Sequence, residues 1–96
     1  MILVRDVFQA KYGKGGELVT LLKEAQKAFP DLLYGTRILT DASGPFFTVV
    51  TETELESLAA WEKRAAQIFS EPAFQPWFAR MEPLVESGRR EFYNVE

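Results

Sequence analysis

The stretch ILTDASGPFFTVV, residues 38–50, has the pattern of a β-hairpin, because two apolar runs flank a short polar turn. The residues of the turn, 41–44, end in Gly44, which can take the positive φ that hairpin turns often need. Alternating apolar residues on either side are typical of strands. We therefore predict a hairpin whose strands cover residues 32–40 and 46–52.

Helical spacing appears on both sides of this hairpin. Before it, apolar residues at Leu18, Leu21, Leu22, Ala25 and Phe29 predict an amphipathic helix that ends at a proline, residue 30. After it, the sequence TELE at 53–56 has the pattern of a capping box. We therefore predict that a second helix begins at Thr53 and runs to about Phe69.

The two ends of the chain complete the pattern. Residues 2–8 and 89–95 predict a first and a last strand. Between the second helix and the last strand, Ser70 is expected to cap a short further helix. That helix has an apolar stripe and a kink expected at Pro76, and Gly88 should end the helical region. The stripe consists of Phe74, Trp77, Phe78 and Met81.

The order of elements is β-α-β-β-α-β with an extra short helix before the last strand. This is the ferredoxin-like pattern of an α+β fold with an antiparallel sheet, in which strands one and three are central neighbours. The 96 residues, 47% hydrophobic and 26% charged, suit a single globular domain over residues 1–96.

The chain contains neither cysteine nor histidine. Disulfides, Cys/His zinc sites, histidine-ligated haem and histidine-dependent catalysis are therefore excluded. Acidic side chains show no metal-ligand spacing, so we predict no metal and no cofactor. A net charge of −3 without a basic block indicates no nucleic-acid partner. A charge after four residues indicates neither a signal peptide nor a membrane span, and we expect a cytoplasmic protein.

A partner for the sheet face away from the helices is expected. Residues 46–50 place Phe46 and Val50 on one side of their strand and Phe47 and Val49 on the other. A sheet with one face in water should instead alternate apolar with polar residues. An exposed apolar face marks an interaction surface, so we predict a homodimer. A loop or the helical insert folded over this face is the alternative.

Three stretches resemble the dimeric α+β barrel superfamily, in particular NIPSNAP-like proteins and antibiotic-biosynthesis monooxygenases. They are the turn 12–15, the segment SLAAWE at 57–62 and the segment SEPAFQPW at 70–77. The resemblance implies two sheets meeting across a two-fold axis, with a small-molecule pocket between each sheet and its helices. Members of the superfamily include cofactor-free oxygenases and haem enzymes, several of which depend on the histidine that this chain lacks.

Glu62 is the first candidate for a binding residue. A helical wheel of the second helix places Glu62 on the apolar side, where a carboxylate needs a basic partner. Arg5 and Arg37, each on a strand, are the expected partners. The alternative to a ligand-orienting carboxylate is a structural ion pair or a helix rolled so that Glu62 lies at its rim, and this alternative is favoured.

Trp61, Phe74 and Trp77 are further candidates, because together they could line an apolar pocket with an indole donor. Plain core packing is the favoured alternative. The glycine-rich residues 13–16 could hold an anion but more simply form a tight turn. Arg89 and Arg90 could bind a carboxylate or belong to a solvated strand end.

Two functions remain open. The first is a homodimer that binds a small apolar or aromatic metabolite without strong catalytic machinery. The second is a cofactor-independent monooxygenase or isomerase of an aromatic or enolisable molecule. An open cavity with a charged residue inside would favour binding or chemistry, whereas a filled interior would favour a scaffold.

Overall fold

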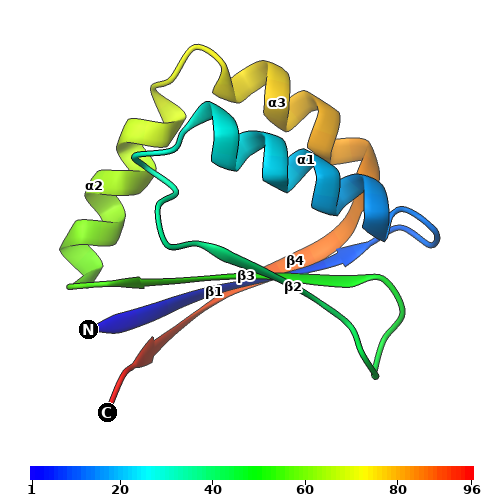
Figure 1. The fold of residues 1–96 in the computed structure, drawn as a ribbon, viewed down its shortest axis with the longest axis horizontal. Helices are drawn as coiled ribbons and strands as arrows, with labels where there is room; N and C mark the ends of the chain where they lie inside the picture. The colour runs from blue at the N-terminus through cyan, green and yellow to red at the C-terminus, as the bar shows by residue number, and fades with distance from the viewer.

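The computed structural model describes residues 1–96 as a four-stranded sheet with all helices on one face (Figure 1). The elements in chain order are β1 (Ile2–Ala10), α1 (Gly15–Ala28), β2 (Arg37–Thr40), β3 (Thr48–Leu55), α2 (Leu58–Phe69), α3 (Phe74–Met81), the 3₁₀ turn η1 (Glu82–Leu84) and β4 (Val85–Asn94). None of the helices combines the length and the apolar character that a membrane crossing requires.

The strand order is β2-β3-β1-β4, and all neighbouring strands are antiparallel. Strands one and three are therefore the central pair, as the right-handed connection rule predicts. The predicted α+β, ferredoxin-like order with an extra helix before the last strand is confirmed.

Helix α1 forms where the apolar spacing predicted it. Leu18, Leu21, Leu22 and Ala25 are buried along one stripe, and Glu17 lies in the first turn, where a negative charge suits the helix dipole. Two contacts join α1 to α3: the Trp77 Nε1 donates to the Leu21 carbonyl at 2.8 Å, and Arg80 pairs with Glu24 at 2.7 Å. These contacts fix α3 beside α1.

The predicted start of the second helix is wrong. Thr53 belongs to β3, which extends to Leu55, and its hydroxyl lies 2.6 Å from the hydroxyl of Thr36. The N-cap of α2 is Ser57, whose Oγ accepts from the amide of Ala60 at 3.1 Å. The TELE pattern misled the prediction because strand pairing with β1 outweighs a local capping motif.

The observed boundaries of the strands also differ from the predicted ones. Strand β2 begins at Arg37 rather than at residue 32, and β3 begins at Thr48, so residues 46 and 47 lie in the connection. Phe47 has a φ of 61°, a left-handed conformation that strand pairing does not allow. Strand β4 begins at Val85 and runs through Gly88, which was expected to precede it.

The short third helix has a different start from the one predicted. Ser70 ends α2 and donates its hydroxyl to the carbonyl of Gln67 rather than capping the next helix. Helix α3 starts after Ala73. Pro76 is its third residue, where the missing N–H has no intrahelical partner, so the helix continues through Pro76.

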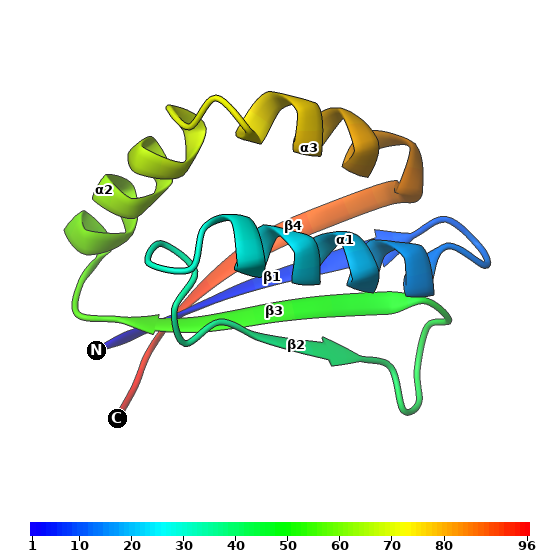
Figure 2. The ribbon, with the colours of Figure 1, turned by 45° about the horizontal axis from the view of Figure 1, so that its top comes forward.

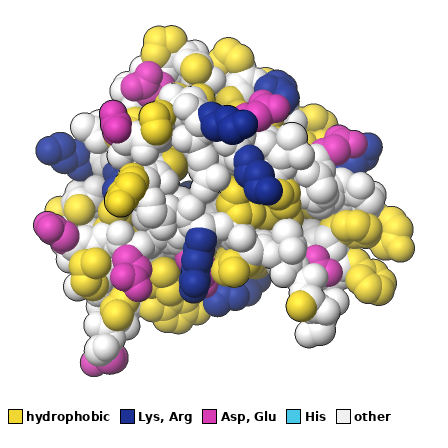
Figure 3. Space-filling view, in the orientation of Figure 1, with side chains coloured by type: hydrophobic (Ala, Val, Ile, Leu, Met, Phe, Trp, Pro, Cys, Tyr) yellow, Lys and Arg dark blue, Asp and Glu magenta, His cyan; other side chains and the backbone are white.

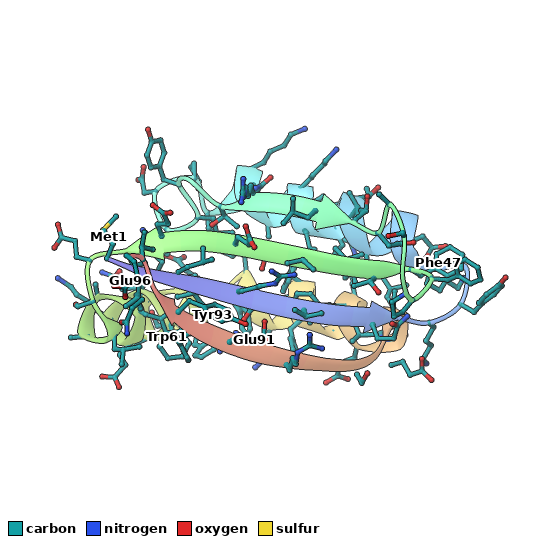
Figure 4. The ribbon with its side chains drawn as sticks, turned by 90° about the horizontal axis from the view of Figure 1, so that it is seen from below. Met1, Phe47, Trp61, Glu91, Tyr93 and Glu96 are labelled. Atoms are coloured by element: carbon teal, nitrogen blue, oxygen red, sulfur yellow. The ribbon has the colours of Figure 1, made fainter.

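The sheet has an inner face, toward the helices, and an outer face. Val49 lies on the inner face, packed against Leu18 and Leu22, whereas Val50 pairs with Val7 on the outer face. Of the four residues expected to make the third strand apolar on both sides, Val49 and Val50 do lie on opposite faces of β3, whereas Phe46 and Phe47 precede the strand. The next outward position after Val50 is Glu52. Figure 4 views this outer face, where Glu91 and Tyr93 belong to β4.

The space between sheet and helices is filled at one end and open at the other. Ala10, Leu18, Leu22 and Val49 form the filled end, under α1 and α3. Helix α2 covers the other end, where both termini lie (Figure 2). In the space-filling view of Figure 3, acidic and basic side chains are interspersed, so this side of the molecule has no patch of one sign.

Candidate functional site

An apolar chamber of about 310 Å³ lies between the inner face of the sheet and the three helices. It is lined by 23 residues, of which 16 are hydrophobic, and every helix and strand contributes. This volume is at the lower end of the range of roughly 300–1,000 Å³ for small-molecule sites. The chamber therefore has the size and the lining of a site for one small organic molecule.

Alternation along the strands makes the floor of the chamber. Val4, Asp6 and Phe8 on β1 all point inward, because side chains two apart share a face. Thr51, on β3, does the same from the adjacent strand. The floor thus mixes apolar surface with a few polar groups at fixed positions.

Aromatic rings form much of the roof. Phe74 lies with its centroid 5.1 Å from Phe69, 5.7 Å from Phe78 and 6.1 Å from Trp77. Trp61 makes an edge contact with Phe92 at 5.2 Å. The two tryptophans of the chain, Trp61 and Trp77, both line the chamber, so intrinsic fluorescence would respond to its contents.

The neutral polar groups of the lining are largely satisfied by one another. The hydroxyls of Thr36 and Thr53 are 2.6 Å apart, and Gln26 donates to the Thr36 carbonyl at 2.8 Å. These bonds stabilise the start of β2 against β3 and α1. They leave few neutral donors free for a ligand.

Asp6 and Arg90 form a bidentate pair across β1 and β4. The Arg90 Nε and Nη2 donate to the two carboxylate oxygens of Asp6 at 2.6 and 3.2 Å. The Arg90 guanidinium also lies 4.9 Å from the ring centroid of Trp61, a cation–π distance. Asp6 is the one carboxylate of the lining, and it is fully engaged with Arg90.

Arg64 is the unpaired charge of the chamber. It projects from α2, and its Nη1 is buried with no hydrogen-bond partner. No acidic side chain forms an ion pair with it, although Asp6 lines the same chamber. Arginine stays charged in proteins, so this guanidinium keeps a donor available to a ligand.

Three of the six predicted site residues come together in the chamber: Trp61, Phe74 and Trp77. Arg5 and Arg37 do not, because both project from the outer face. Each pairs there with Glu52, Arg37 at 2.6 Å and Arg5 at 3.5 Å. The expected pairing of these arginines with Glu62 is therefore wrong, and the acidic residue that they share is Glu52.

The helical wheel that put Glu62 on the buried side of the second helix is wrong, and the favoured alternative of a rolled helix agrees with the structure. Glu62 is exposed, does not line the chamber and takes part in none of the ion pairs. The wheel that placed it inside assumed that Leu55 belongs to the helix, which it does not. The inward residues of α2 are Trp61, Arg64, Ala65 and Ile68, so the helix is rolled by about one residue's rotation.

Arg64 and Asp6 were not among the candidates predicted from the sequence, and Arg90 was a candidate only together with Arg89. The spacing i, i+3, i+4, i+7 counted from Trp61 would have found Arg64. Arg89 and Arg90 are adjacent, and alternation along β4 sends them to opposite faces. Arg90 enters the chamber, while Arg89 pairs with Glu91 at 3.0 Å on the outer face.

Comparison with solved structures identifies the fold. An uncharacterized NIPSNAP domain protein from Burkholderia xenovorans superposes with a TM-score of 0.86 at 16% identity, covering 100% of this chain and 95% of that one. A NIPSNAP family protein from Agrobacterium tumefaciens gives 0.88 at 20% identity, covering 99% and 92%. An antibiotic biosynthesis monooxygenase gives 0.74 at 13% identity, covering 100% and 99%.

The expected resemblance in fold to NIPSNAP-like and antibiotic-biosynthesis-monooxygenase proteins is therefore confirmed. No protein-family model matches the chain, and no curated protein matches it. The likeness defines the class of fold, because function depends on the site rather than on the fold.

Proposed function

We propose that this protein is a cytoplasmic homodimer that binds a small apolar or aromatic metabolite in the chamber, without strong catalytic machinery. The open chamber of about 310 Å³ with its mostly hydrophobic lining carries this proposal. A scaffold protein would fill such space, because well-packed interiors have few voids larger than a water molecule.

Native mass spectrometry of the protein from its own host tests the proposal. The expected result is a co-purified small molecule that is absent from a variant whose chamber is filled. Ala65→Phe adds a ring inside the chamber, and Ala66→Phe adds the same ring on the exposed side of α2. Binding retained in Ala65→Phe, or absent from every preparation and every apolar probe, would refute the proposal.

A dimer through the outer face is supported by one row of apolar side chains. Leu39, Val50 and Val7 are register partners across β2, β3 and β1. Tyr93 on β4 is 48% exposed on the same face. Val7 and Val50 are already buried, at 9% and 7% exposure, so a second copy would remove apolar surface from water mainly at Leu39 and Tyr93, at about 25 cal/mol for each Å².

Light scattering at micromolar concentration measures this association. The native protein should have the mass of a dimer, and Leu39→Asp should shift it toward monomer. Leu58→Asp is the matched control, because Leu58 is also exposed but lies on α2, away from the outer face. A native protein that remains monomeric would remove the homodimer from the proposal.

The second candidate is a cofactor-independent monooxygenase or isomerase. It is supported by a carboxylate and two guanidiniums that share an aromatic-lined chamber, since a guanidinium can stabilise a developing oxyanion. Asp6 would have to serve as the base, yet it is held by two hydrogen bonds from Arg90. That engagement makes binding the better supported function, and an Asp6-dependent turnover of a phenol or enolisable ketone would reverse the order.

A further inference from the structure

The charges that line the chamber do not balance. Its charged lining residues are Asp6, Arg64 and Arg90. Asp6 and Arg90 neutralise each other through two short hydrogen bonds, at 2.6 and 3.2 Å. Arg64 is left with one uncompensated positive charge beside an apolar lining.

The unpaired donor of Arg64 is buried. Its Nη1 has no hydrogen-bond partner. Leaving a charged donor without a partner away from water is costly, and arginine cannot escape the cost by losing its proton. An anionic group of a ligand would satisfy this donor, whereas a neutral hydrocarbon would leave it as it is.

Size and lining limit what that anion can be. The chamber holds about 310 Å³, and most of its lining is hydrophobic. A phosphate dianion would lose strong hydration and find one free guanidinium, so the balance of charge favours a single negative charge. A carboxylate suits a guanidinium geometrically, and an attached ring or short hydrocarbon would pack against Trp61, Phe74 and Trp77.

We propose that the ligand is a small apolar carboxylic acid, bound as its anion, whose carboxylate pairs with Arg64 inside the chamber. This inference rests on the proposed binding function and specifies its ligand class. Arg64 is then the residue that selects acids over neutral molecules of the same shape. Asp6 and Arg90 form the paired wall beside it and do not compete for the ligand.

The test compares two probes that differ in charge but hardly in shape. Phenylacetate and phenylacetamide are titrated into the native protein at neutral pH, and binding is followed by calorimetry and by tryptophan fluorescence. The native protein should bind the anion about 10- to 100-fold more tightly, the range expected for a charge-assisted hydrogen bond. Indole serves as a neutral probe of the chamber itself.

Variants assign the preference to one side chain. Arg64→Met keeps the length and apolar stem, and it should bring the affinities for the two probes within about threefold. Arg64→Gln is a second variant that keeps hydrogen-bonding capacity without charge and should lose the preference as well. Lys63→Met removes an equal charge from the adjacent exposed position and should leave the preference unchanged.

The outcomes distinguish the preference for a carboxylate from the ability of the chamber to bind a small molecule. Equal binding of both probes by the native protein, or a preference that survives Arg64→Met, would overturn the carboxylate inference while leaving the chamber as a binding site. Failure of all three probes, indole included, to bind the native protein would overturn the proposed function and this inference together. A thermal melt of each variant shows whether a loss of binding reflects a loss of fold.

Discussion

The arginines on the outer face of the sheet are all paired, whereas the chamber on the inner side holds one, Arg64 of α2, with an unpaired buried donor. On the outer face, Arg37, Glu52, Arg5 and Glu91 are register partners that cross all four strands as a row of alternating charge, here called the charge row. On the inner side, Asp6 and Arg90 satisfy each other, and Arg64 has a buried donor without a partner.

Arginines that stabilise the sheet have acidic partners. Even the Arg5 Nε, which has no hydrogen bond, lies 3.7 Å from the Glu91 carboxylate and is therefore compensated. Pairing across strands stabilises a sheet, because opposite charges directly opposite one another attract. The buried Nη1 of Arg64 has no such partner, and this is the observation on which the proposed carboxylate site rests.

The largest effect is expected from breaking the charge row. Glu52 is 6% exposed and accepts from Arg37 at 2.6 and 2.9 Å. Glu52→Ala would leave Arg5 and Arg37 without their shared partner, and it should lower the free energy of unfolding by about 2–3 kcal/mol. Urea denaturation at one fixed protein concentration measures the change.

Glu54→Ala is the control for that experiment. Glu54 is an exposed residue of the same strand and face that forms none of the ion pairs. Its replacement should change stability by less than about 0.5 kcal/mol. Equal effects at the two positions would show that the charge row does not stabilise the sheet.

A smaller effect is expected from breaking the inner pair. Asp6→Asn keeps the shape but removes the charge that holds Arg90, whose side chain is 42% exposed. Because water partly screens this pair, the loss of stability should be roughly 1 kcal/mol. A thermal melt measures it, and a cost above that of Glu52→Ala would invert the comparison between the faces.

The roll of α2, which brings Arg64 into the chamber, depends on where that helix begins. Ser57→Ala removes the hydrogen bond from the Ala60 amide and should cost about 1 kcal/mol. Circular dichroism during thermal unfolding measures this cost. Ser70→Ala is the comparison at the other end, where the hydroxyl donates to a carbonyl within the helix, and a larger effect there would contradict the assigned cap.

Little change in stability is expected from Arg64→Met. The substitution removes an unpaired donor and keeps most of the apolar stem, so the free energy of unfolding should stay within about 0.5 kcal/mol or rise. Denaturation without ligand measures it. A loss above about 1 kcal/mol would mean that Arg64 already has a structural partner and that the contrast with Arg5 is false.

The smallest effect on stability is expected from lowering the pH, through the carboxylate of Glu91. A hydrogen bond from Arg89 lowers the pKa of Glu91 from its ordinary value of 4.5, against a smaller opposing effect of burial. A lowered pKa in the folded state means that the ionised carboxylate favours folding. This contribution is present above pH 4.5 and is lost as the pH falls through the folded pKa. A side-chain NMR titration should show the low value, and Arg89→Ala should return it toward 4.5.

Periodicity predicted most of the fold but not the boundaries that orient the site. Helix α1 and the strand order follow from apolar spacing and connection rules, which average over many residues. The roll of α2 depends on a single boundary, at Ser57, and a capping pattern at Thr53 obscured it. That one displacement put Glu62 inside and Arg64 outside.

The site was predictable in its apolar part. Trp61, Phe74 and Trp77 were predicted as candidates from their helical spacing, and all three line the chamber. Its charged part depends on which face each strand residue occupies and on which partners lie across the sheet. Sequence order does not contain that information for Asp6 and Arg90, which are 84 residues apart.

Helices α1 and α2, which both cover the chamber, differ in how many of their residues are buried. Helix α1 buries five residues, whereas no residue of α2 is fully buried. Local opening requires less energy where fewer apolar contacts are broken. Amide hydrogens of α2 should therefore exchange with solvent sooner than those of α1. A molecule bound in the chamber as proposed would then leave most readily when α2 opens, and its half-life there would report the local stability of that helix.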